Sequence, residues 1–80
     1  MTVSFGVRIV DASGNGVEGA EVVVFYPYAT DRSLTDTDGW VRFEKTHYFG
    51  DALRTTIFVD GQIQAENVWI EDENTFLFTV

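Results

Sequence analysis

Residues 3–10, VSFGVRIV, decide the fold class because they alternate apolar with small or polar side chains. The apolar members are Val3, Phe5, Val7 and Ile9, and Ser4, Gly6 and Arg8 lie between them. This period of two is typical of a β-strand that buries one face. Nothing longer in the chain has the period of a helix, so the sequence predicts an all-β protein.

Further short apolar or β-branched segments follow, separated by turn signals. They are AEVVVFYP (20–27), a short segment at 33–35, WVRFEK (40–45), LRTTIFV (53–59), QIQAENVWI (62–70) and TFLFTV (75–80). The turn-forming residues are Gly19, Gly39, Asp60 and Gly61, and THYFGDA (46–52) is a longer connection. About seven strands with turns roughly every ten residues predict a two-sheet antiparallel β-sandwich, transthyretin-like or immunoglobulin-like.

Length and charge limit the classes of function. The 80 residues form one domain, 1–80, and 45% hydrophobic residues are enough to fold it. A formal net charge of −8 argues against a nucleic-acid partner, which needs a basic surface. No stretch is long and apolar enough for membrane insertion, and the first ten residues have no signal-peptide pattern. Localisation is therefore not predicted from the residues.

Two motifs carry a family resemblance. VRIVDASGNGVEGAEVVV (7–24), followed by LTDTDGWVRFE (34–44), resembles the carboxypeptidase regulatory-like domain of the transthyretin-like β-sandwiches. The residues that match are Val17, Gly19, Ala20 and Val22 in the first motif and Thr35, Asp36, Gly39 and Phe43 in the second. The resemblance covers about residues 5–45. It implies an accessory or surface-associated module without catalysis, and it allows a secreted or surface-exposed parent protein.

Catalytic constellations are missing from the sequence. One enzyme of the transthyretin-like group, hydroxyisourate hydrolase, has a closing Tyr-Arg-Gly-Ser motif and several active-site histidines, whereas this chain has only His47, expected in an exposed loop. A Gly-x-Ser-x-Gly elbow, a glycine-rich phosphate loop and a His-x-x-x-His pair are also missing. The sequence therefore predicts no catalytic residues and no enzyme.

The stretch TDTDGW (35–40) is the best candidate for a metal site. Asp36 and Asp38 are oxygen ligands of the kind that calcium prefers, but placing Gly39 at position six of a calcium loop puts Leu34 first and Lys45 last, which are not ligands. The favoured interpretation is a turn capped by Asp36. No cofactor is predicted, and calcium stays an alternative if EDEN (71–74) or Asp31 lies at the same end of the sandwich.

Strand parity predicts an outward apolar set. If Val41, Phe43, Val68 and Ile70 point inward, Trp40 and Trp69 point outward. The outward apolar set is Val23, Phe25, Trp40, Trp69 and Leu77. The alternative is that a β-bulge reverses parity and places one or both tryptophans in the core.

Together these patterns predict a non-catalytic interaction or structural module. The outward apolar set favours a protein partner or a homo-oligomer, because exposed aromatic patches commonly mark such contacts. A carbohydrate-binding module that stacks sugar rings on exposed Trp or Tyr, stabilised by calcium, is the alternative. The apolar, uncharged strand TFLFTV adds a tendency to pair at its edge with another chain.

Overall fold

The computed structural model describes residues 2–46 and 53–80, so His47 and most of the predicted 46–52 connection lie outside the described residues. The described residues form seven strands. They are β1 (Thr2–Val10), β2 (Glu21–Phe25), β3 (Thr30–Leu34), β4 (Trp40–Thr46), β5 (Leu53–Val59), β6 (Gln62–Ile70) and β7 (Thr75–Thr79). Within this part of the chain, no helix has the length and apolarity needed to cross a membrane.

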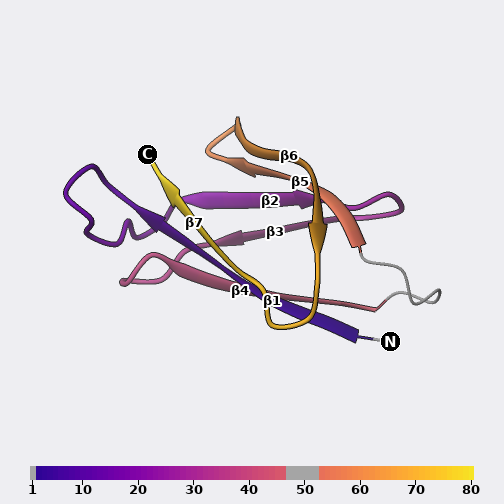
Figure 1. The fold of residues 1–80 in the computed structure, drawn as a ribbon. Coiled ribbons are helices and arrows are strands. Elements are labelled where there is room, and N and C mark those ends of the chain that lie inside the picture. Colours follow the sequence, from indigo (N-terminus) through magenta and orange to yellow (C-terminus); the bar gives the residue numbers. More distant parts are fainter. Residues whose placement is uncertain (1, 47–52) are drawn as a thin grey trace.

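The strands form two sheets, which confirms the predicted all-β sandwich (Figure 1). The three-stranded sheet has the order β4-β1-β7, and the four-stranded sheet has the order β3-β2-β5-β6. One pairing departs from the antiparallel expectation, because β7 runs parallel to β1. The chain crosses from β6 in one sheet to β7 in the other, so β7 enters beside β1 from the end where β1 begins.

The core is built from the inward residues that the period-two patterns predict. Phe5 stacks on Phe43 across the β1–β4 pair, with ring centres 5.5 Å apart, and meets Phe76 of β7 edge-on at 6.3 Å. The opposite sheet supplies mainly β-branched side chains, which pack well on a pleated surface. The largest fully buried members are Phe5, Val7, Ile9, Val22, Val24, Ile57, Val59 and Ile70.

The short third strand was predicted at the wrong residues. β3 spans Thr30–Leu34 rather than 33–35, because a tight turn after β2 returns the chain at once. The amide of Tyr26 donates to the carbonyl of Ala29, and Phe25 then pairs with Thr30. Thr35 lies beyond the strand. It is buried, accepts a hydrogen bond from the amide of Ala20 and donates one to the carbonyl of Val17.

The β5–β6 hairpin contains two register shifts. Its turn has Asp60 and Gly61 at φ 48° and 84°, as the sequence signal predicts. Beyond the turn, the pairing shifts between Thr55 and Ile57 and again between Ile57 and Phe58. Asn67 lies in the first shifted segment of β6 with φ 60°. Two extra residues on β6 leave the parity of its two ends unchanged, since the side-chain period is two.

Candidate binding surfaces

The outward apolar set is divided between the two sheets. Trp40 and Leu77 lie on the outer face of the three-stranded sheet, whereas Val23, Phe25 and Trp69 belong to the four-stranded sheet. Parity predicts whether a side chain faces in or out, but it does not say which sheet carries it. The members of the outward apolar set therefore do not share one face, and the molecule has two separate outer surfaces.

Trp40 lies across β1 on the outer face of the three-stranded sheet. Its indole covers Gly6, where an added Cβ would stand 3.3 Å from Cζ3, so the missing side chain of Gly6 gives the ring its place. The Arg8 guanidinium is 5.9 Å from the ring centre, and its Nε donates to the carbonyl of Asp38. Trp40 remains 39% exposed. A glycine covered by a cross-strand aromatic side chain is a known device for stabilising sheets.

Leu77 lies on the same outer face, on edge strand β7 of the three-stranded sheet. Trp40 and Leu77 both pair with Arg8, one from each neighbouring strand, so the three side chains share the outer face. Leu77 is 62% exposed. Beside the indole is a shallow depression of about 420 Å³, lined by Gly6, Asp36, Trp40, Val41 and Arg42.

The outer face of the four-stranded sheet is more apolar. Phe25 meets Phe58 edge-on with ring centres 5.1 Å apart, and Phe58 pairs with Ile63 on β6. Val23 also faces outward, but its neighbours cover it to 8% exposure, so it supports this surface without being available to a partner. Exposed apolar side chains on this face are Phe25, Leu34, Ile63 and Trp69, and we call these four with Phe58 the sheet patch.

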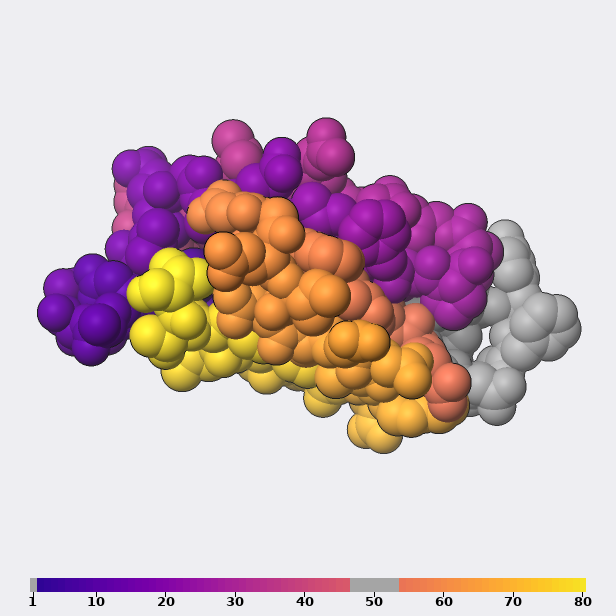
Figure 2. Space-filling model, turned by 90° about the horizontal axis from the view of Figure 1, so that it is seen from above, coloured from indigo at the N-terminus to yellow at the C-terminus, as the bar shows by residue number. Residues whose placement is uncertain are grey.

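Trp69 forms the end of the sheet patch nearest the β6–β7 turn. It pairs with Arg54, whose guanidinium carbon is 4.7 Å from the indole centre, and it is 54% exposed. Such a cation–π contact holds the ring against the Arg54 side chain while the ring stays exposed to solvent. On this side of the molecule, Figure 2 shows the orange strands β5 and β6 beside purple β2, with β5 between β2 and β6 in the sheet.

Sequence parity missed three members of the sheet patch. Phe58 could have been found, because the alternation of Thr55, Ile57 and Val59 inward places it outward. Ile63 follows from Phe58 across the hairpin turn. Leu34 had no usable signal, because it is the only large apolar residue of β3 and the strand therefore has no apolar alternation.

The TDTDGW stretch forms a turn. Asp36 Oδ1 accepts hydrogen bonds from the amides of Asp38 and Trp40, both at 2.9 Å. Gly39 has φ 83°, and a Cβ there would overlap the carbonyl oxygen of Ile9, which only glycine avoids. One oxygen of the Asp36 carboxylate is therefore already used by the backbone, which supports the interpretation as a turn.

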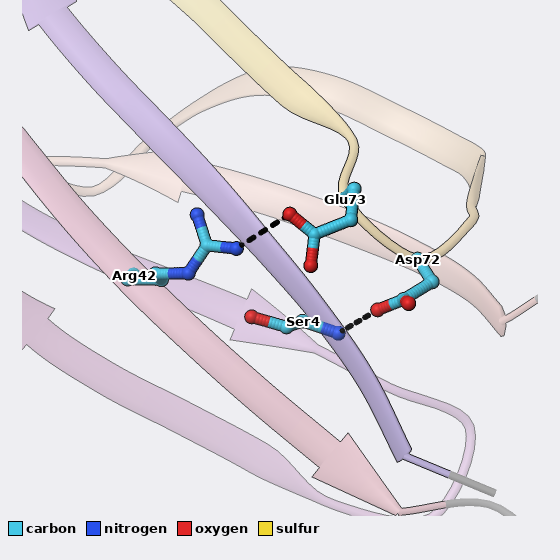
Figure 3. Close-up of polar contacts among 4 residues, drawn as sticks. All are labelled: Ser4, Arg42, Asp72 and Glu73. Carbon is cyan, nitrogen blue, oxygen red and sulfur yellow. Dashed lines mark hydrogen bonds and ion pairs between the residues drawn. The ribbon is translucent and has the colours of Figure 1, made fainter.

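The acidic residues of EDEN anchor the start of β7 to the three-stranded sheet (Figure 3). Asp72 Oδ1 accepts from the amide of Ser4 at 2.9 Å, and Glu73 Oε2 lies 3.1 Å from Arg42 Nη2. Asn74 Oδ1 accepts from the amide of Glu71 at 2.8 Å. Asp72 and Glu73 therefore have local structural roles, one as a hydrogen-bond acceptor for the backbone and the other as an ion-pair partner of Arg42.

A polar cluster joins the two sheets at the β3–β4 edge. Lys45 Nζ is 3.3 Å from Asp31 Oδ1 and lies 4.8 Å from the centre of the Tyr26 ring. Burial raises the pKa of the Tyr26 hydroxyl well above its usual value, and the negative charge of Asp31 adds to the shift. The cluster fixes the alignment of the sheets at this edge.

The described residues contain no group of three His, Cys, Asp or Glu side chains that could hold a metal ion. No protein-family model matches the chain, and a search of curated proteins finds no match. The chemistry that the described surfaces offer is apolar contact, cation–π contact and backbone pairing.

Proposed function

We propose that the chain is a non-catalytic binding module that takes a protein partner on the sheet patch. The observation that carries this proposal is the concentration of Phe25, Leu34, Ile63 and Trp69 as exposed side chains on one face. Exposed aromatic and aliphatic side chains that gather on one face of a small domain commonly mark a binding site.

The composition of the sheet patch suits the centre of a protein interface. Aromatic side chains and arginine are enriched there because they bury much surface at small entropic cost. Trp69 with Arg54 supplies such an anchor, and Phe25 with Phe58 supplies a second one. The net charge of −8 favours a partner with a basic rim around an apolar centre.

The resemblance to the carboxypeptidase regulatory-like domain supports the same proposal. The matched motifs form the turns that lead into β2 and β4, and the resemblance implies an accessory or surface-associated module that is often joined to other domains. On this reading the sheet patch contacts a neighbouring domain or a separate protein, and the module contributes binding rather than chemistry.

Capture followed by a direct affinity measurement tests the proposal. The immobilised chain captures partners from an extract of its source, and the purified partner is then titrated calorimetrically against variants with checked folding. We expect Trp69→Ala and Ile63→Ser to weaken binding by about tenfold or more, as for interface anchors. Trp40→Ala on the opposite sheet should leave the affinity unchanged. Equal affinity for all three variants would contradict the proposal.

A glycan is the second candidate, and Trp40 is the observation that favours it. A flat, exposed indole beside a depression lined by Asp36 and Arg42 combines a stacking surface with hydrogen-bonding groups. Oligosaccharide titrations followed by tryptophan fluorescence in Trp69→Phe, which keeps Trp40, should show a saturable change that Trp40→Phe lacks. If the fluorescence of neither variant changes, the glycan site is ruled out.

A further inference from the structure

The three-stranded sheet is one strand short beside β7. The two sheets are aligned at the β3–β4 edge by the ion pair between Lys45 and Asp31. The three-stranded sheet ends at β7, while the four-stranded sheet continues to β6, and β6 and β7 are not paired with each other. A groove of about 300 Å³ lies there, lined by Val59, Asp60, Gln62, Gln64, Thr79 and Val80. Figure 2 shows yellow β7 along this margin next to orange β6.

Of the four edge strands in the described residues, β7 alone has none of the usual protection against pairing. Natural edge strands carry charges, proline or bulges that discourage a further strand. β3 has Asp31 and Arg32, and β4 has Arg42, Glu44 and Lys45. β6 has two register shifts. β7 has the regular, uncharged sequence Thr-Phe-Leu-Phe-Thr.

The free backbone groups of β7 can be assigned. Val80 donates its amide to Val10, and Asn74 accepts at its carbonyl from the amide of Gly6, so the even-numbered residues turn their backbone groups toward β1. Backbone groups alternate in direction along a strand. The amide and carbonyl groups of Thr75, Leu77 and Thr79 therefore point to the open edge.

The sequence of β7 is a palindrome centred on Leu77. We propose that β7 pairs antiparallel with β7 of a second copy of this chain about a two-fold axis at Leu77. Thr75 then lies opposite Thr79 of the second copy, Phe76 opposite Phe78, and Leu77 opposite Leu77. All the residues with free backbone groups meet one another, and each such pair exchanges two hydrogen bonds. A two-fold interface needs this kind of self-complementary surface.

The side chains agree with this register. Thr–Thr and aromatic–aromatic cross-strand pairs are favourable, and no charged pair is created although each copy carries a net charge of −8. Leu77, 62% exposed in the single chain, gains an apolar neighbour on the outer face. Phe76 and Phe78, stacked 6.2 Å apart on the inner side, meet the same pair from the second copy. This surface is separate from the sheet patch, so the inference does not depend on the proposed function.

Sedimentation of the 80-residue chain tests the pairing. We expect a dimer at high micromolar concentration whose dissociation constant rises by about tenfold or more in Leu77→Pro, which removes an outward amide and leaves the bonds to β1 intact. Leu77→Lys should have the same effect, because it places two like charges opposite each other. It keeps the test valid if the proline variant does not fold. Trp69→Ala should still dimerise.

A single introduced cysteine tests the register, because the chain has none of its own. Hydrogen-bonded antiparallel pairs have Cα atoms about 5.5 Å apart, which suits a disulfide. We expect Leu77→Cys to form a disulfide dimer rapidly on mild oxidation. Leu34→Cys is the matched control, since Leu34 is also 62% exposed on an edge strand, and it should react slowly.

Three results would overturn the inference. One is a chain that stays monomeric at millimolar concentration. Another is cross-linking of Leu77→Cys no faster than that of Leu34→Cys. The third is a dimer that survives Leu77→Pro and Leu77→Lys but is lost in Trp69→Ala, which would place self-association on the sheet patch instead.

Discussion

Gly39 and Gly61 have nearly the same backbone conformation, with φ 83° and 84°, but different surroundings. A Cβ at Gly61 would meet nothing within 4 Å, whereas one at Gly39 would overlap the carbonyl oxygen of Ile9. Gly61→Ala should therefore cost about 1–2 kcal/mol of the free energy of unfolding, from the left-handed conformation alone. Gly39→Ala should cost about 1–3 kcal/mol more, because the backbone must also shift. Urea unfolding of both variants measures the difference, and equal costs would contradict the contact.

Tyr26 makes the stability sensitive to alkaline pH. Its folded-state pKa is raised by burial and by Asp31, while the unfolded tyrosine ionises near its ordinary value of 10.0. The stabilising contribution is therefore fully present below about pH 10 and is lost as the pH rises above it, because only the unfolded state releases the proton. Compared with Tyr26→Phe, the wild type should lose up to about 1.4 kcal/mol for each further pH unit. The prediction is wrong if the free energies of unfolding of the two proteins differ by the same amount at every pH between 8 and 11.

At the scale of the strands, apolar alternation predicted the fold where one face is apolar and failed where it is not. β1, β4, β5, β6 and β7 were expected within about a residue of their observed limits, because each buries one row of side chains. β3 has only Leu34 as a large apolar residue, and that side chain faces outward. Its position depends on the turn between Phe25 and Thr30. Single-sequence periodicity does not contain that information.

The turn that begins at Asp36 gives a prediction about calcium. Its carboxylate already accepts two amide hydrogen bonds, so added calcium or a chelator at constant ionic strength should leave the thermal midpoint unchanged. Asp36→Ala should lower the free energy of unfolding by about 1–2 kcal/mol, because both amides lose their acceptor. A saturable rise of the midpoint with calcium that Asp36→Asn abolishes would instead indicate a bound ion by linkage.

At the scale of the whole molecule, the division into three and four strands determines which surfaces are available. Parity placed Trp40, Trp69 and Leu77 outward, but their separation onto two faces depends on which strands share a sheet. That partition results from long-range pairings such as Arg8 with Leu77. Local pattern does not encode such pairings, so the outward residues could be predicted and their grouping into sites could not.

The net charge of −8 gives a prediction for the whole chain. The three ion pairs found among the described residues include two between well-exposed side chains, which contribute little. Repulsion among 13 acidic residues should dominate instead. The thermal midpoint should therefore rise as sodium chloride increases, most steeply below about 0.2 M, where the screening length changes fastest. A midpoint that falls with salt would mean that the ion pairs dominate.

The parallel β1–β7 pair also determines how the molecule bears tension. Figure 1 places the start of β1 and the end of β7 at opposite ends of the sandwich, and the two strands are in register from Gly6–Thr75 to Val10–Thr79. A pull between these ends slides the strands past each other and loads all their hydrogen bonds in shear. The β5–β6 hairpin, pulled from its open end, would instead unzip one bond at a time. We therefore expect the rate of forced unfolding between these ends to be set mainly by the β1–β7 ladder.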